Sequence, residues 1–156
     1  MDTFISILHV AGAVFIVGPM AILPMTAMRA VRAGNGAQVA VLAKSTTIFA
    51  WLSLLVFVFG FGAMSMAPDE YELSITRPWI LWSSSLYVIA FALTLFVVVP
   101  SMKKAAAALE VGAGAGAGAA ASGADAPKAS YPAIAAGSGI SSLLLLAVVV
   151  LMVWKP

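Results

Sequence analysis

Four long runs without a charged residue constrain the fold of this 156-residue chain more than any other feature. The runs are 26, 24, 25 and 26 residues long and cover residues 3–28, 45–68, 78–102 and 129–154. Each run is longer than the ~20 apolar residues that cross the hydrocarbon core of a bilayer as an α-helix. The runs therefore predict an integral membrane protein with four spans.

The composition excludes the main soluble classes. Hydrophobic residues make up 63% of the chain and charged residues 9%, with a mean hydropathy of +1.09. Soluble domains carry roughly 25% charged residues, and disordered chains combine low hydrophobicity with high net charge. There is no cysteine, which excludes disulfides, iron–sulfur ligation and a cysteine nucleophile. The basic residues behind the net charge of +2 flank the apolar runs, so we expect no nucleic-acid binding.

Each span is predicted to be α-helical, because backbone that faces lipid must satisfy its own hydrogen bonds. We predict an all-α fold, an integral membrane four-helix bundle with both termini outside (N-out/C-out), in which residues 1–156 form a single membrane domain. The helices are expected at about 4–28, 47–66, 78–99 and 133–154. No basic residue precedes the first span, which is also longer than the apolar core of a signal peptide, so we expect it to be retained.

The basic residues predict the orientation of the spans. Six of the eight lie in the two loops that follow the first and third spans: Arg29, Arg32, Lys44, Lys103, Lys104 and Lys128. Only Arg77 and Lys155 lie on the opposite side. The positive-inside rule then places both loops in the cytoplasm, and the expected location is the plasma membrane, which is the inner membrane of a bacterial cell. The Gly/Ala-rich segment 111–128 predicts a flexible cytoplasmic linker.

His9 is the only histidine and lies about two turns into the first span. Ionisable residues within membranes are costly and tend to be functional. A neutral imidazole can ligate a haem iron, carry protons, or form a hydrogen bond to a neighbouring helix. Gly12 and Ala13 follow at i+3 and i+4 and leave this helix face open. A hydrogen bond to a helix or head group is the simpler interpretation, and haem b at His9 is the cofactor alternative. No other metal site and no catalytic residue is predicted.

Two other groups within the spans favour structural roles. Gly18-Pro19 and Pro24 interrupt the first span, and broken helices mark the binding sites of some transporters. We find no charged residue there and no matching break in another span, so the sequence predicts a simple kink. Ser83–Ser85 are expected to donate hydrogen bonds between helices, because the base that a nucleophile needs is absent from their span.

Four residues are candidates for contact with a partner. Asp69, Glu70 and Glu72 lie close together in the loop between spans two and three, where they fit a divalent cation, a basic partner surface or simple solvation. Gly139 follows Ala135 by four residues, a small-xxx-small spacing that permits close helix approach. The expected partners are the lipid bilayer and other membrane-protein subunits.

Three segments resemble the DUF2269 family of predicted four-span bacterial integral membrane proteins. They are residues 8–14, residues 77–90 with the start Arg-Pro-Trp-Ile-Leu-Trp, and Val99-Pro100. This resemblance implies no established activity. The early histidine is also similar to that of copper-resistance D-like and protoporphyrinogen-oxidase-like membrane proteins, where a following Trp-x-Gly-Gly stretch is associated with haem or metal. Residues 15–19 read Phe-Ile-Val-Gly-Pro and lack the tryptophan and the second glycine.

The function expected from these features is that of a non-catalytic accessory or assembly subunit of a larger bacterial membrane complex. Its spans hold no charged side chain, and its loops are too short to form a catalytic domain. The Ala/Gly-rich composition is typical of GC-rich actinobacteria, where small accessory helices decorate respiratory supercomplexes, so respiratory electron transport is the expected context. The alternatives are a haem- or quinone-associated membrane protein that uses His9, and a small transporter.

Overall fold

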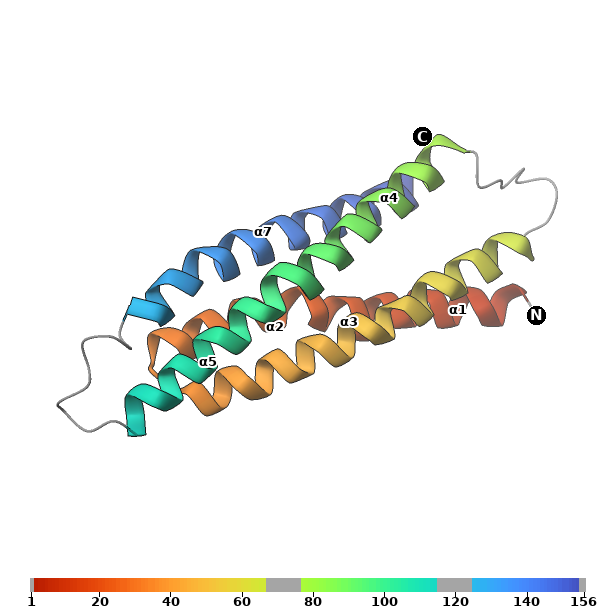
Figure 1. Ribbon diagram of the computed structural model, residues 1–156. Coiled ribbons are helices and arrows are strands. Elements are labelled where there is room, and N and C mark those ends of the chain that lie inside the picture. The colour runs from red at the N-terminus through yellow and green to blue at the C-terminus, as the bar shows by residue number, and fades with distance from the viewer. Residues whose placement is uncertain (1, 67–76, 115–124, 155–156) are drawn as a thin grey trace.

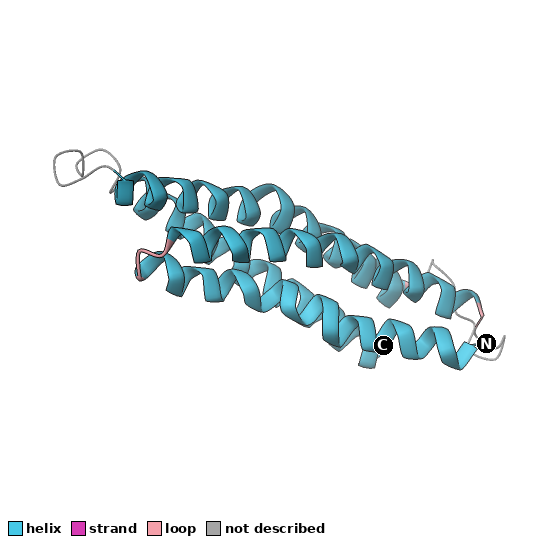
Figure 2. Ribbon diagram, turned by 90° about the horizontal axis from the view of Figure 1, so that it is seen from below, coloured by secondary structure: helices cyan, strands magenta, loops and turns pink. Residues whose placement is uncertain are grey.

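A computed structural model of the protein describes residues 2–66, 77–114 and 125–154. Every regular element in these residues is a helix, as Figures 1 and 2 show. The first span consists of α1 (Asp2–Gly12), the π-helical segment η1 (Ala13–Val17) and α2 (Gly18–Arg32), and the second is α3 (Gly36–Ser65). The third consists of α4 (Pro78–Leu93), the π-helical segment η3 (Thr94–Val98) and α5 (Val99–Gly114), and the fourth is α7 (Asp125–Trp154). The predicted all-α architecture is confirmed.

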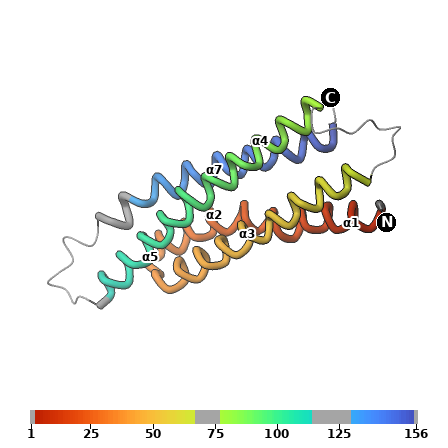
Figure 3. The backbone as a smooth tube through the Cα atoms, turned by 45° about the vertical axis from the view of Figure 1, so that its right-hand side comes forward, coloured from red at the N-terminus to blue at the C-terminus, as the bar shows by residue number. Residues whose placement is uncertain are grey.

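Four helical stretches are long and apolar enough to cross a membrane: Thr3–Arg32, Gly36–Ser65, Pro78–Ala113 and Ser130–Trp154. Successive spans run in opposite directions, so the first and last described residues lie at the same end of the bundle (Figures 1 and 3). We call this the terminal end. The opposite end, here the basic end, carries Arg29, Arg32, Lys44, Lys103 and Lys104. That the basic end faces the cytoplasm stays a prediction.

The helices extend beyond the apolar spans. Helix α3 begins at Gly36 rather than near residue 47, because Asn35 caps it: the Asn35 side chain accepts a hydrogen bond from the backbone N–H of Gln38 at 3.0 Å. Gly34, with φ of 72°, supplies the left-handed residue that turns the chain between α2 and α3. Helix α5 continues to Gly114 and α7 begins at Asp125, so helix occupies both ends of the predicted 111–128 linker. Alanine-rich sequence favours this extension; residues 115–124 lie outside the described part.

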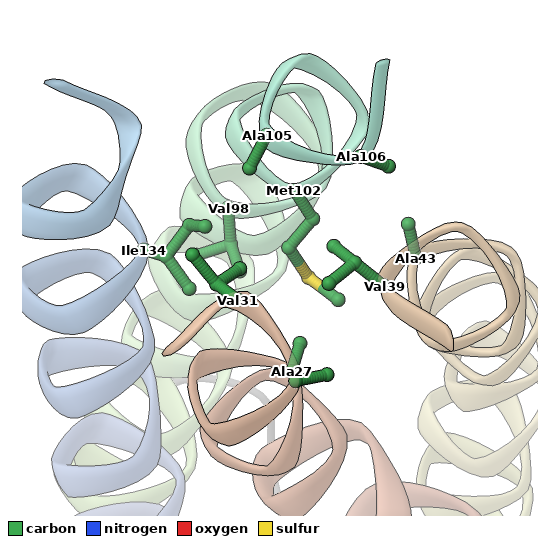
Figure 4. Close-up of a cluster of buried hydrophobic side chains, with 10 residues drawn as sticks. Ala27, Val31, Val39, Ala43, Val98, Met102, Ala105, Ala106 and Ile134 are labelled. Carbon is green, nitrogen blue, oxygen red and sulfur yellow. The ribbon is translucent and has the colours of Figure 1, made fainter. Parts of the chain in front are cut away.

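Small residues bring the helices together at the basic end. In Figure 4, Met102 of α5 projects toward Val39 of α3 and Ala27 of α2, and it is fully buried. The buried core cluster consists of Ala27, Ala30, Val31, Val39, Ala43, Val98, Met102, Ala105, Ala106 and Ile134. A Cβ atom on Gly36 would lie 3.0 Å from the backbone oxygen of Ala106, so α3 and α5 approach almost backbone to backbone. Such close contact is what holds helices together where lipid is as apolar as the side chains.

Toward the terminal end, the α1–α3 pair and the α4–α7 pair draw apart (Figures 1 and 3). Aromatic side chains fill the wider spacing in the middle of the bundle: the Phe57 ring of α3 stacks on the Tyr87 ring of α4 with centroids 4.7 Å apart. Within the most hydrophobic window of each span, 6% of residues are buried in the first span and 33% in the third and fourth. The first span is therefore more peripheral than the third and the fourth.

Both π-helical segments end two residues before a proline. In η1 the N–H of Gly18 bonds to the oxygen of Ala13, and Pro19 follows. In η3 the N–H of Val99 bonds to the oxygen of Thr94, and Pro100 follows. A proline cannot donate to the carbonyl four residues earlier and its ring crowds that carbonyl, which a wider turn relieves. The prediction that no other span matches the break in the first span is wrong, because the third span has the same arrangement.

Candidate functional site

His9 lies on α1 against α3, and its ring is tied to the α3 backbone. The Nδ1 atom is 2.8 Å from the carbonyl oxygen of Val56. A carbonyl oxygen can only accept, so Nδ1 carries the proton and donates it to this bond. In the neutral imidazole, Nε2 is then left with its lone pair. Among the described residues Nε2 has no hydrogen-bond partner of its own.

Two glycines make this contact sterically feasible. A Cβ atom on Gly60 would lie 2.8 Å from Cε1 of His9 and 3.2 Å from Nδ1. A Cβ atom on Gly12 would lie 2.7 Å from Cγ2 of Val56. Side chains on a helix lean toward the preceding turn, so a side chain at position 60 would also cover the Val56 carbonyl. Glycine at 12 and 60 thus gives the imidazole access to that oxygen.

This geometry matches the simpler interpretation of His9, a hydrogen bond to a neighbouring helix. Within the described ranges, no group of three or more His, Asp or Glu side chains gathers as a potential metal site. Haem ligation at His9 stays a prediction. The site therefore offers one immobilised imidazole. Its Nδ1 atom is bonded to α3, and its Nε2 atom can accept a hydrogen bond or bind a metal.

Hydroxyl groups link the remaining helices. Ser53 of α3 and Tyr87 of α4 share a hydrogen bond of 2.7 Å between Oγ and Oη. Thr94 of η3 donates to Ser141 of α7 at 3.4 Å and to its own helix at 2.8 Å. Ser142 of α7 donates to the backbone oxygen of Ala21 in α2 at 3.3 Å. No buried side-chain nitrogen or oxygen in the described part lacks a partner, so these polar groups hold the bundle together.

Ser83 does not have the role predicted for it. Its hydroxyl donates to the backbone oxygen of Trp79, one turn earlier in the same helix, at 2.6 Å. A serine hydroxyl within a helix reaches the carbonyl one turn earlier without help from any neighbour. Tyr87, which the sequence did not single out, instead makes an interhelical side-chain bond of α4, and the backbone oxygen of Ala90 in α4 accepts from Ser141 of α7 at 3.5 Å.

The predicted partner contacts divide into two groups. Asp69, Glu70 and Glu72 lie outside the described residues. Gly139 is described, and a Cβ atom added to it would meet nothing within 4 Å, so no other described helix presses on it. The close contact in this glycine-rich segment belongs to Gly137, where a Cβ atom would lie 2.8 Å from Cγ2 of Val98.

A cation–π contact at the basic end was also missed. The guanidinium carbon of Arg32 lies 5.0 Å from the centroid of the Tyr131 ring, which joins the end of α2 to α7. The two residues are far apart in the sequence, and neither carries a local pattern that pairs them. Only the antiparallel packing of the first and fourth spans brings them together.

Comparison with known families supports the membrane assignment. The family model described as "Predicted integral membrane protein (DUF2269)" matches residues 3–156. The chain belongs to the DUF2269 family. The resemblance seen in the sequence is thereby confirmed, and this DUF2269 protein is an integral membrane protein with four candidate spans. No curated protein and no solved structure matches it.

Proposed function

We propose that this DUF2269 protein is a non-catalytic accessory or assembly subunit of a larger bacterial membrane complex, in respiratory electron transport. The supporting observation is the incomplete cover of the first span. Helix α1 packs on α3, whereas α4 and α7 make no comparable contact with it in the described part of the chain. The uncovered side chains of α1 and η1 are Phe4, Ile7, Val10, Val14 and Phe15, each between 58% and 73% exposed.

This uncovered face suits a transmembrane partner helix. Phe4, Ile7 and Val14 follow the helical spacing that places side chains on one stripe. Helices in a bilayer associate through packing of such faces and through occasional hydrogen bonds. The respiratory context rests on the composition of the chain.

The proposal is tested by affinity purification in mild detergent from the native host, followed by mass spectrometry. Other membrane subunits are expected in fixed ratio to this chain. Val10→Trp on the uncovered face of α1 should release them, whereas Val88→Trp on α4 should not, although Val10 and Val88 are similarly exposed at 61% and 53%. Recovery of the chain alone, in stoichiometric homo-oligomers, would contradict an accessory role.

The fixed tautomer of His9 favours a second candidate, a haem- or quinone-associated membrane protein. Histidines that ligate metals usually donate their other ring N–H to a carboxylate or a backbone carbonyl, as Nδ1 of His9 does to Val56. A haem would supply one-electron chemistry, and His9 would hold its iron through Nε2. Because the chain has one histidine, a bis-histidine haem needs a second copy or another subunit.

An absorption spectrum of the purified protein separates the two candidates. A Soret band that disappears in His9→Ala, while the far-ultraviolet circular dichroism stays unchanged, is the result expected for haem. Bound quinone is tested by extracting it from the wild-type protein and from His9→Ala and measuring it by chromatography. A colourless, quinone-free protein that co-purifies with other subunits supports the accessory role.

A further inference from the structure

The cations of the basic end border the apolar spans, where hydropathy predicts the level of the lipid head groups. The first charge-free run ends just before Arg29, and its 26 residues span about 39 Å as a helix, against ~30 Å for the hydrocarbon core. Lys44 and Lys103 border the second and third runs at the same end. Each of these three spans therefore brings a cation to one membrane surface.

Arg29 and Arg32 have a local arrangement that goes beyond a general attraction for anionic lipid. The guanidinium carbon of Arg32 lies over the Tyr131 ring, 5.0 Å from its centroid, and Tyr131 packs against the core cluster of the basic end. Arg29 lies three residues earlier on α2, a spacing that makes the two side chains neighbours on the helix surface. Both arginines are exposed.

The basic residues at this end outnumber the acidic ones, Glu110 and Asp125, so the positive charge is only partly offset within the described chain. Arg29, Arg32, Lys44, Lys103 and Lys104 form no ion pair with an acidic side chain there. A planar guanidinium binds phosphate through two parallel hydrogen bonds, which an ammonium group cannot match.

We propose that Arg29 and Arg32, with Tyr131 behind Arg32, form a binding site for the phosphodiester head group of an anionic phospholipid. Its preferred ligand class is the cardiolipin type, because two phosphodiesters on one glycerol fit two adjacent guanidinium groups. The neighbouring lysines supply the attractive field, and the arginine pair supplies the geometry. Basic pockets between transmembrane helices bind such head groups in general.

Native mass spectrometry tests the site on the full chain, released from vesicles of phosphatidylcholine with or without cardiolipin. The wild-type protein should retain cardiolipin in preference to phosphatidylcholine. Removing both charges in Arg29→Gln/Arg32→Gln should weaken retention about 25-fold, at about fivefold per cation. The charge-preserving change Arg29→Lys/Arg32→Lys should weaken it about fivefold, through loss of the paired hydrogen bonds. The matched variant Lys103→Arg/Lys104→Arg should leave it unchanged.

Further variants separate the site from diffuse attraction. Tyr131→Phe keeps the aromatic ring under Arg32 and should bind as the wild type does. Tyr131→Leu should lose affinity, while its melting temperature in phosphatidylcholine shows that it is folded. Equal losses in Arg29→Gln/Arg32→Gln and Lys103→Gln/Lys104→Gln would overturn the site. So would displacement of the lipid by millimolar inorganic phosphate, which would indicate a site for the free ion. Absence of any preference for cardiolipin would also overturn it and would point to an acidic protein partner.

Discussion

Replacing Gly60 with alanine tests the contact between His9 and α3 directly. The new Cβ atom would lie 2.8 Å from Cε1 of His9, closer than real Cβ atoms approach other heavy atoms. The ring can move away only by giving up the 2.8 Å hydrogen bond from Nδ1 to the Val56 oxygen. We therefore expect the bond to break in Gly60→Ala.

The magnitude follows from three contributions. A hydrogen bond between transmembrane helices contributes ~0.6 kcal/mol on average and ~1.7 kcal/mol at most. Crowding of a packed contact adds about 1–3 kcal/mol, and the better helix propensity of alanine returns up to about 1 kcal/mol. The free energy of unfolding should fall by roughly 1–3 kcal/mol in Gly60→Ala. In Gly139→Ala, where the Cβ atom meets nothing within 4 Å, it should stay level or rise.

Reversible unfolding of the purified protein in mixed micelles of dodecyl sulfate and a mild detergent measures these values. A double-mutant cycle with His9→Ala isolates the contact, because Gly60→Ala should cost little once the imidazole is absent. If Gly60→Ala were as harmless as Gly139→Ala, or equally costly with and without His9, the proposed packing of His9 on Gly60 would be refuted.

Three further substitutions probe other contacts by the same unfolding assay. Ser53→Ala should cost about 0.6–1.7 kcal/mol, because it leaves the buried Tyr87 hydroxyl without its 2.7 Å partner, and an unchanged stability would contradict that bond. Gly137→Ala should cost about 1–3 kcal/mol through contact with Val98, and Val98→Ala should relieve part of the Gly137→Ala penalty if the contact is real. Met102→Ala should cost about 2–5 kcal/mol, more than Met25→Ala, because Met102 is fully buried and Met25 is 41% exposed.

The architecture was predictable because hydropathy acts locally. Each charge-free run meets the length requirement of a membrane helix by itself, without reference to any other run. The helix ends were less predictable, because they depend on capping and on alanine content. Asn35 caps α3 well before its apolar run begins, and a hydropathy pattern does not register a cap.

The candidate site was predictable in its central residue and not in its contacts. His9 is conspicuous as the only histidine in an apolar span, but the approach of Val56 and Gly60 depends on how α1 lies on α3. The two π-helical segments escaped notice for a similar reason. Pro19 and Pro100 mark the two breaks in the sequence. The wider π-helical turn is a backbone adjustment, and no residue type indicates it.

Each π-helical segment is equivalent to an α-helix into which one residue has been inserted. One residue turns a helix by about 100°, so η1 determines which face of α1 meets α3. Deletion of one residue from Ala13–Val17 would restore a regular helix of equal hydropathy and would turn His9 away from the Val56 oxygen. Substitutions among these five residues, none of which is buried, would leave the register intact. Within Ala13–Val17, the number of residues, more than their identity, keeps the imidazole on its carbonyl.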